Sequence, residues 1–300
     1  MIGSLPSPSS GSIDLGFIEL RAYGLMIALG VIAAVWLFGR QLERKGVGTA
    51  DDASSIGMWG VAAGIIGARL YHVATEWSKF SDDLGAIPQI WKGGLGIPGG
   101  LLAGALVGVW QGKRRGIEPA VVLTCAAPAI PLAQAIGRWG NWFNQELFGR
   151  PTDLPWALEI DDRHNLGYPT GTTFHPTFLY ESLWNLGLVG VLLWIDRRFR
   201  LGPGRLFAVY VIGYGIGRFW VEGLRIDPTE GSDVAGLRWN QWVALAAIVI
   251  GGAYLWWSRG RTWPEPAVDA PPEQPEPDAA DAAATEAEVD AAEPDEAETT

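Results

Sequence analysis

Long apolar stretches alternate with short polar segments through the first 257 residues of the chain. Each stretch is roughly 17 to 25 residues long, the length a helix needs to cross the hydrocarbon core of a bilayer. The stretches cover residues 20–38, 56–73, 94–111, 119–136, 178–195, 206–222 and 241–257. This pattern predicts an all-α, polytopic membrane protein with seven transmembrane helices. The fourth stretch is the least regular, because Pro128 and Pro131 interrupt it, where a helix interior would lose hydrogen bonds.

The last part of the chain has a different composition. Between Glu265 and Glu298 lie 13 of the 33 acidic residues and no Lys or Arg, which leaves 22 basic against 20 acidic residues elsewhere. Such a segment, rich in Ala, Pro, Glu and Asp, buries too little apolar surface to fold. We therefore expect two regions, a membrane domain at 1–260 and a disordered acidic cytoplasmic tail at 261–300. The tail is either a solubilising extension or a segment that docks to a specific partner.

The positions of the basic residues predict how the helices are oriented. Twelve of the 22 lie in the segments that follow the first, third, fifth and seventh stretches. Because Lys and Arg accumulate on the cytoplasmic side, we expect an outer N-terminus and a cytoplasmic C-terminus. The first 19 residues lack the pattern of a cleavable signal, so we expect the first span to be retained. The outer loops are expected to form a small extracytoplasmic head, with 150–173 either a cap or an ordinary surface loop.

The positions of the cysteine and the histidines do not indicate a disulfide or a metal site. The single cysteine, Cys125, excludes an intramolecular disulfide and lies in an apolar context typical of a packing residue. His72, His164 and His175 show no metal-ligand spacing, so no metal site is expected. His175, directly before the fifth stretch, is either a structural cap or a catalytic group.

A polar signature of 13 residues lies between the fourth and fifth stretches and reads G-R-W-G-N-W-F-N-Q-E-L-F-G from Gly137 to Gly149. Arg138 keeps its charge at physiological pH, and its planar donor fork matches a phosphate. Asn141 and Asn144 follow at intervals of three, so on a helix they share a face with Arg138. The same residues would also suit an interfacial belt in which Arg138 reaches lipid phosphates.

A second polar group occupies the sixth stretch. Tyr214, Arg218 and Glu222 are spaced by four. Arg225 follows seven residues after Arg218, so the spacing predicts that all four side chains project from one helical face. A buried salt bridge would explain the Arg218–Glu222 pair but not the other two residues. Charges inside a bilayer are costly unless paired or used, so two arginine groups indicate a polar site.

The signature at 137–149 resembles that of the prolipoprotein diacylglyceryl transferases, a family of bacterial membrane enzymes. Matches in chain order also occur at 21–24 (RAYG), 67–69 (GAR), Gly99-Gly100, 175–181 (HP and YE) and 214–225. The resemblance extends over about residues 15–258 and leaves the acidic tail outside. A 13-residue signature supported by five ordered anchors is specific.

The resemblance implies an enzyme of the bacterial plasma membrane that begins lipoprotein maturation. Such a transferase moves the sn-1,2-diacylglyceryl group of phosphatidylglycerol to the thiol of a lipobox cysteine, forming a thioether and releasing glycerol 1-phosphate. Its partners are phosphatidylglycerol, the signal peptide of a prolipoprotein and the bilayer, with no nucleic acid. No cofactor is implied, because the leaving group arrives activated as a phosphodiester.

The resemblance also implies roles for individual residues. The catalytic residues are expected to be Arg138, Arg218, Tyr214, Glu222 and Glu146. Phosphatidylglycerol is expected to bind at Arg138, Asn141, Asn144, Gly149, Tyr23 and Arg225. The two essential arginines would stabilise the leaving phosphate, with charge-assisted hydrogen bonds of about 1.5 to 3 kcal/mol each.

The chain departs from the family pattern at one position. Many members have a histidine, proposed as the base for the thiol, where this chain has Pro98. A proline side chain cannot accept a proton. The candidates for a replacement base are Glu146, Glu222, His175 and Tyr214. Alternatively, the field of the arginines lowers the thiol pKa enough to make a base unnecessary.

Three other interpretations compete with the transferase. An anion or lipid-headgroup transporter would use the same arginines, and inverted repeats would favour it, but the two arginine groups differ in sequence and spacing. A catalytically inactive paralogue would explain Pro98, although Arg138, Asn141, Arg218 and Glu222 are intact. A receptor-like seven-helix protein leaves the arginines unexplained.

Overall fold

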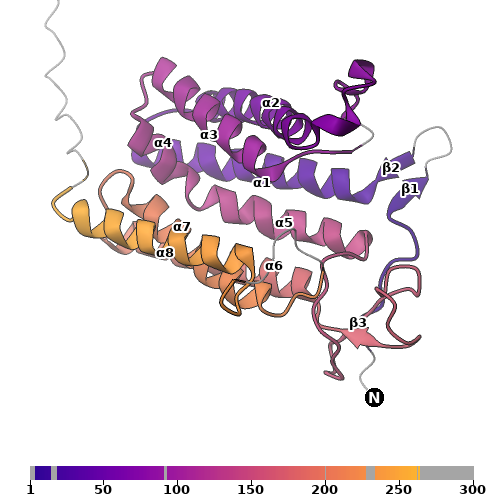
Figure 1. The fold of residues 1–300 in the computed structure, drawn as a ribbon. Helices are drawn as coiled ribbons and strands as arrows, with labels where there is room; N and C mark the ends of the chain where they lie inside the picture. The colour runs from indigo at the N-terminus through magenta and orange to yellow at the C-terminus, as the bar shows by residue number, and fades with distance from the viewer. Residues whose placement is uncertain are drawn as a thin grey trace, which may run out of the picture. The chain divides into compact units, whose positions relative to one another are not determined.

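The computed structural model describes residues 4–14, 19–90, 93–199, 201–227, 234–261 and 263, and this part is almost entirely helical (Figure 1). The helices are α1 (Ala22–Lys45), α2 (Ala50–Thr75), α3 (Ile97–Arg114), α4 (Pro119–Ala126), α5 (Ala129–Phe143), α6 (Thr177–Phe199), α7 (Arg205–Glu222) and α8 (Trp239–Trp257), with 3₁₀ turns η1 (Trp77–Lys79) and η2 (Leu84–Ala86). The strands form two antiparallel pairs, β1 (Ser12–Asp14) with β2 (Glu19–Arg21) and β3 (Leu158–Glu159) with β4 (Thr173–Phe174). The predicted all-helical fold class is confirmed.

Each predicted apolar stretch lies on a helix, except the fourth, which is divided between α4 and α5. These two helices meet at a bend of 43°. Pro128 precedes α5 and Pro131 falls in its first turn, where a missing N–H costs no intrahelical bond. Among the described residues, α1, α2 and α6 are each long and apolar enough to cross a membrane, and the bent pair makes a fourth if it is one span.

The helices pack in the spatial order α3, α2, α1, α5, α6, α7, α8 (Figure 1). The closest pair is α2 with α3, where small residues face each other. A Cβ on Gly67 would lie 2.6 Å from the carbonyl oxygen of Gly99, so a larger residue at position 67 would force the two backbones apart. The glycine-rich start of α3 therefore allows close helix packing.

A tight turn makes α1 and α2 antiparallel neighbours. Gly46 ends α1 in the left-handed conformation, at φ 65°, and its N–H bonds the carbonyl of Glu43. Thr49 begins α2 with a capping box, because its side chain accepts from the Asp52 N–H while the Asp52 carboxylate accepts from the Thr49 N–H. The apolar faces of the two helices then pack on α4, where Cys125 is fully buried.

Residues 144–176 form a small ordered lobe at the C-terminal end of α5, here called the β lobe (Figure 1). Its core is Phe148, Leu158, Ile160 and Phe174, packed against Phe178 of α6. The N-terminal segment joins it through a bridge between Leu5 and Leu158. The polar segment at 150–173 is therefore a packed structure with its own core, and not an ordinary surface loop.

A polar group lies near the C-terminal ends of α1 and α6, and is here called the Asp196 cluster (Gln41, Arg44, Lys45 and Asp196). The Asp196 side chain is completely buried, and Lys45 Nζ lies 2.7 Å from its Oδ1. Arg44 pairs with the second carboxylate oxygen and also donates to Gln41. This cluster ties the ends of α1 and α6 together. Of the predicted acidic tail, residues 264–300 lie outside the described residues.

Candidate active site

The polar signature forms the C-terminal end of α5. Arg138 and Asn141 lie on the last turns of the helix, and Asn144 is the residue at which it ends. Arg138 Nη1 donates to Asn141 Oδ1 at 3.2 Å. The amides of Asn141 and Asn144 both donate to Glu146 Oε1, at 2.7 and 3.4 Å. The spacing of three thus places these side chains in one continuous network.

Glu181 on α6 joins the two arginine groups that the sequence singles out. Its Oε2 lies 2.7 Å from Arg138 Nη2, and its Oε1 lies 3.7 Å from Arg218 Nη1. The carboxylate is 7% exposed. Arg138 and Arg218 come from α5 and α7, which are 80 residues apart in sequence at these positions, so Glu181 is the group that holds them together.

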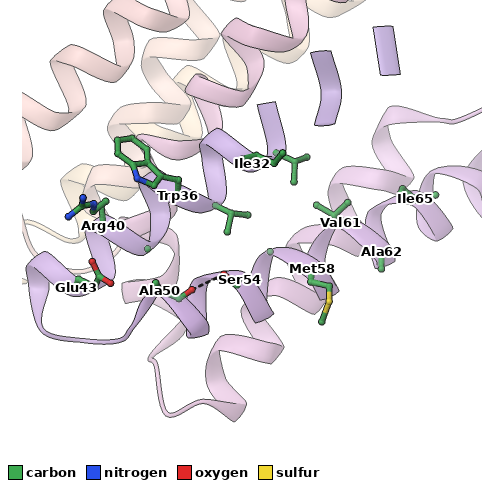
Figure 2. A pocket seen from close by; sticks show the side chains of 14 residues that line it. Ile32, Trp36, Arg40, Glu43, Ala50, Ser54, Met58, Val61, Ala62 and Ile65 are labelled. Atoms are coloured by element: carbon green, nitrogen blue, oxygen red, sulfur yellow. Dashed lines mark hydrogen bonds between the residues drawn. The ribbon is translucent and has the colours of Figure 1, made fainter. Parts of the chain in front are cut away.

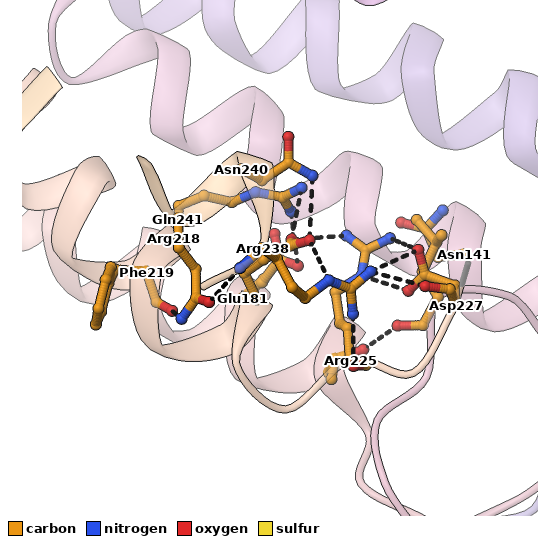
Figure 3. Close-up of polar contacts among 12 residues, drawn as sticks. Asn141, Glu181, Arg218, Phe219, Arg225, Asp227, Arg238, Asn240 and Gln241 are labelled. Atoms are coloured by element: carbon orange, nitrogen blue, oxygen red, sulfur yellow. Dashed lines mark hydrogen bonds and ion pairs between the residues drawn. The ribbon is translucent and has the colours of Figure 1, made fainter. Parts of the chain in front are cut away.

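Glu222, the last residue of α7, is completely buried among cations. The arginines paired with it, Arg218, Arg225 and Arg238, are labelled in Figure 3. Arg218 Nη2 lies 2.9 Å from its Oε2, and Arg225 Nη1 lies 3.8 Å from the same atom. Its Oε1 lies 3.1 Å from Arg238 Nε and accepts a hydrogen bond from Asn240 Nδ2, also at 3.1 Å. A buried carboxylate needs such compensation, since an uncompensated charge there would cost several kcal/mol.

Arg225 does not lie on the helical face that the spacing predicts. Helix α7 ends at Glu222, and the chain turns at Gly223, so Arg225 lies three residues beyond the helix. Its backbone forms a bridge with Gly149, and its guanidinium pairs with Asp227 at 2.8 Å. The helical prediction is wrong at this residue because pairing with the β lobe takes the backbone out of the helix. Arg225 still reaches Glu222.

Gly149 connects the β lobe to the arginines, and only glycine fits there. Its N–H donates to the carbonyl of His175 at 2.9 Å, and the next residue, Arg150, donates to the carbonyl of Leu224. A Cβ at Gly149 would lie 2.8 Å from the Cβ of His175 and 3.1 Å from the Leu224 oxygen. A side chain at this position would therefore push the β lobe away from the end of α7.

Two tyrosines of the predicted set border the network. Tyr214 lines a small cavity with Glu181 and Arg218, about 10 Å³ in volume, which is the space of roughly one water. The ring of Tyr23 packs on Gly140 of α5, where a Cβ would lie 2.7 Å from Tyr23 Cδ2. In this state the arginines are closed on their carboxylates, so a lipid headgroup needs side chains to move apart.

His175 lies beside the same region, at the start of α6. Its Nδ1 is 3.1 Å from the hydroxyl of Tyr180, which also accepts from Trp156 at 3.0 Å. Burial, together with the nearby Arg150, holds the pKa of His175 below its usual value. The imidazole is therefore neutral at neutral pH and able to accept a proton.

Sequence reasoning missed four members of the network. Glu181 belongs to a matched motif, and the need of two buried arginines for a counter-charge is the signal that would have found it. Arg238 and Asn240 come directly before the last apolar stretch, at the start of α8, and Asp227 lies two residues after Arg225. Arg238 contacts both Glu222 and Asp227, at 3.1 and 3.6 Å. By contrast Arg69, a further cation of the sequence motifs, donates to backbone carbonyls at 86–94.

The ion pairs of the network contain more arginines than carboxylates. The arginines are Arg138, Arg218, Arg225 and Arg238, and the carboxylates paired with them are Glu181, Glu222 and Asp227. Four arginines thus meet three paired carboxylates, and Glu146, which joins the network through Asn141, balances the remaining positive charge. Guanidinium groups offer five donors each, so they can bind a further anion without losing every present partner.

Comparison with known proteins agrees with this chemistry. The sequence model of the family described as "Prolipoprotein diacylglyceryl transferase" matches residues 11–257. A phosphatidylglycerol--prolipoprotein diacylglyceryl transferase from Streptomyces griseus is 48% identical over 255 residues, covering 84% of this chain and 76% of the relative. Proteins of the same name from Frankia alni and Streptomyces coelicolor are 50% and 51% identical, covering 85% and 80% of this chain and 67% and 76% of the relatives. The chain therefore belongs to the prolipoprotein diacylglyceryl transferase family.

Proposed function

We propose that this chain transfers the diacylglyceryl group of phosphatidylglycerol to the thiol of the lipobox cysteine in a prolipoprotein. The observation that carries the proposal is the arrangement of Arg138 and Arg218, which reach the same carboxylate, Glu181, from two different helices. A phosphodiester brings one negative charge and oxygen acceptors suited to guanidinium groups. The family membership and the names of the relatives support the same reaction.

The reaction forms one bond and breaks one. The cysteine sulfur attacks the glyceryl carbon of the diacylglyceryl group, an S–C bond forms, and the C–O bond to the phosphate breaks. Glycerol 1-phosphate leaves with the bonding electrons, and the thiol proton passes to a base. Negative charge therefore grows on the phosphate in the transition state, and preorganised cations at that point lower the barrier.

In this proposal Arg138 and Arg218 hold the phosphate. Glu181 keeps both guanidinium groups aimed at one place before the lipid arrives, and the phosphate oxygens then take over part of their donors. Glu222 fixes Arg218 from the other side and keeps its charge compensated. Orientation of this kind is worth most when the donors are already in place, because no reorganisation is needed during the reaction.

The remaining predicted residues form the surroundings of the headgroup. Asn141 and Asn144 offer neutral hydrogen bonds to the glycerol hydroxyls, and Arg225 extends the positive field. Gly149 supports the site through its backbone, by holding the β lobe against the arginines. Tyr23 and Tyr214 border the lipid from α1 and α7. Each of these assignments follows from its position next to the network.

Glu146 is the best-placed candidate for the base. Its Oε1 accepts from Asn141, whose own oxygen contacts Arg138, so the carboxylate is one amide away from the proposed phosphate position. Glu146 is exposed, whereas both oxygens of Glu222 face cations or an amide. His175, neutral and next to Gly149, is the alternative. Either residue would remove the need for a histidine at Pro98.

We further propose that all seven apolar segments span the plasma membrane, with the fourth span made by α4 and α5. The N-terminus then lies outside and the C-terminus in the cytoplasm, which places the β lobe and the arginine network on the outer side. The distribution of Lys and Arg supports this orientation. Residues 1–260 form the membrane domain, and residues 261–300 are a cytoplasmic tail whose composition favours disorder.

The function is tested with purified protein in detergent, radiolabelled phosphatidylglycerol and a synthetic lipobox peptide. We expect label on the peptide, and none when its cysteine is replaced by serine. Arg138→Ala should lower the transfer rate by about 10²- to 10³-fold, while Arg114→Ala, which removes an exposed arginine on another helix, should not change it. No transfer by a folded wild-type protein would contradict the proposal and leave an inactive paralogue or an anion-binding membrane protein. Binding of the lipid without transfer would separate these two outcomes.

A further inference from the structure

A long apolar groove runs between α1 and α2, away from the arginine network (Figure 2). Its volume is about 890 Å³. It exists because Gly39 and Gly57 let the helices approach closely, a Cβ on Gly57 lying 2.5 Å from Val35 Cγ2. The large apolar side chains then flank the contact instead of filling it: Ile32, Val35 and Trp36 on α1, with Met58, Val61 and Ile65 on α2.

One end of the groove carries a cation and an anion side by side. Figure 2 shows Arg40 and Glu43 at this end, with Ile65 at the other. The Arg40 guanidinium lies 5.9 Å over the ring of Trp36, which leaves its donor fork open. Within the described part of the chain, neither Arg40 nor Glu43 has an ion-pair partner, in contrast to Arg44 and Lys45 one turn further on.

The length of the groove matches one leaflet of a bilayer. Its lining runs from Val31 to Glu43 on α1 and from Ala50 to Ile65 on α2. At 1.5 Å per residue these segments are roughly 18 and 22 Å long. Half of a bilayer, headgroups included, is roughly 20 to 22 Å thick. A lipid with its headgroup at Arg40 and Glu43 would therefore lay its acyl chains along the full groove.

We propose that this groove binds a zwitterionic amino-phospholipid as a resident lipid. Arg40 takes the phosphate, and Glu43 takes the ammonium group. The paired opposite charges of the protein complement the paired opposite charges of this headgroup, whereas a headgroup that is only anionic would meet the Glu43 carboxylate unfavourably. The chains fill the apolar lining, whose members are strongly exposed without them, Ile32 by 66% and Met58 by 63%.

This site is separate from the proposed active site. Tyr23 and Arg40 lie at opposite ends of α1, 17 residues or about 26 Å apart along the helix. The groove therefore serves the leaflet opposite to the arginine network and does not hold the transferred lipid. The bound lipid would stabilise the α1–α2 pair and hold the protein at a fixed depth in the bilayer. The inference rests on the proposed crossing of the bilayer by α1 and α2 and does not depend on the proposed reaction.

The test is a titration of delipidated full-length protein in detergent with dioleoyl phosphatidylethanolamine, followed by native mass spectrometry. We expect one saturable adduct that survives a tenfold excess of dioleoyl phosphatidylglycerol. Arg40→Ala and Glu43→Gln should each weaken it at least about tenfold, or about 1.4 kcal/mol. Ala62→Trp, which fills the exposed side of the groove, should remove it. Arg114→Ala is the matched control, since this arginine stacks on Trp110 outside the groove.

The same variants need two further measurements. Their unfolding temperature in lipid-free detergent and their transfer rate in mixed micelles should equal those of the wild type, which shows that only lipid binding has changed. Equal lipid retention by the wild type and Arg40→Ala would overturn the proposal. Displacement of the amino-phospholipid by phosphatidylglycerol would also overturn the proposal, because the site would then recognise the phosphate and not the ammonium group. A dimer that Ala62→Trp dissociates would show that a second copy, and not a lipid, covers the groove.

Discussion

The two ends of the molecule bury carboxylates against cations in different ways. In the Asp196 cluster one completely buried carboxylate meets Arg44 and Lys45, from a single neighbouring helix, among the packed ends of α1 and α6. In the arginine network, Glu181 and Glu222 meet arginines from α5, α7 and the start of α8, next to a cavity and the β lobe. Both groups are ion pairs, yet only the second has the features of a site.

The two polar groups differ in how many elements of the fold they join. The Asp196 cluster links two helix ends, so its role is complete once the helices are joined. The arginine network joins four helices and the β lobe, and it borders polar amides that contact no cation except Arg138. A buried ion pair alone is weak evidence of function. Convergence of several elements and adjacent neutral donors are the additional evidence.

The largest expected effect is at the arginines of the network. Arg138→Ala and Arg218→Ala should each lower the transfer rate by about 10²- to 10³-fold, because each removes a donor to the charge that develops on the leaving phosphate. Arg44→Ala, in the Asp196 cluster, should change the rate by less than about twofold. Rates are measured per folded molecule, with folding checked by size-exclusion chromatography. Similar losses in all three variants would erase the distinction between the two ends.

The second-largest loss of transfer rate is expected at the proposed base. Glu146→Gln keeps the hydrogen bonds of Asn141 but cannot take a proton, so we expect a loss of about 10²-fold, the lower end for general base catalysis. His175→Gln should lose less than about tenfold.

The pH dependence of kcat/KM distinguishes the two residues. Arg150→Ala removes one of the groups that lower the pKa of His175, so this pKa should rise. If His175 were the base, the acid limb of the profile would move to higher pH in Arg150→Ala. We expect it to stay in place, and its movement would assign the base to His175.

A smaller effect is expected where the β lobe meets the network. Gly149→Ala introduces a Cβ only 2.8 Å from that of His175, and such overpacking typically costs about 1 to 3 kcal/mol. We expect about a tenfold loss of transfer, mainly as a higher KM for phosphatidylglycerol, since the lobe would shift without removing a charge. Gly137→Ala is the matched control within the signature, because a Cβ there meets nothing within 4 Å. Equal activity of both variants would contradict a supporting role for the β lobe.

The smallest effect on rate, together with a large effect on stability, is expected at Asp196. Asp196→Asn leaves Lys45 and Arg44 without their counter-charge. Breaking a buried pair typically costs about 3 to 5 kcal/mol, and the partial exposure of Arg44 reduces this. The unfolding temperature in detergent should fall, while the transfer rate at low temperature remains that of the wild type. A variant that is stable but inactive would place the Asp196 cluster within the working site.

Much of the fold follows from the sequence because apolar length and proline position are local properties. The stretches predict where helices occur, and Pro128 predicts the bend between α4 and α5. The β lobe does not follow, since Leu158 and Phe174 become core residues only when two short strands and the N-terminal segment meet. Likewise helical spacing fails at Arg225, because pairing with Gly149 decides its backbone conformation.

The candidate site is predictable to the same extent. Spacing groups Arg138 with Asn141, and Arg218 with Glu222, since each pair lies on one helix. It cannot join the two groups, because Glu181 is 43 residues from the first arginine and 37 from the second. Only packing of α6 between α5 and α7 brings them together. Arg238 was missed for the same reason, as its partner Glu222 lies on the preceding helix.

The shared position of Glu181 also bears on how the chain enters the membrane during synthesis. Arg138 leaves the ribosome first, Glu181 next and Arg218 last. A lone arginine at the edge of a bilayer is costly, and pairing with Glu181 removes most of that cost as soon as α6 follows α5. The α5–α6 hairpin thus contains its own ion pair, and Arg138 needs no partner from the later helices. When α7 arrives, Arg218 meets a carboxylate already in place, and Arg238 at the start of α8 then completes the network.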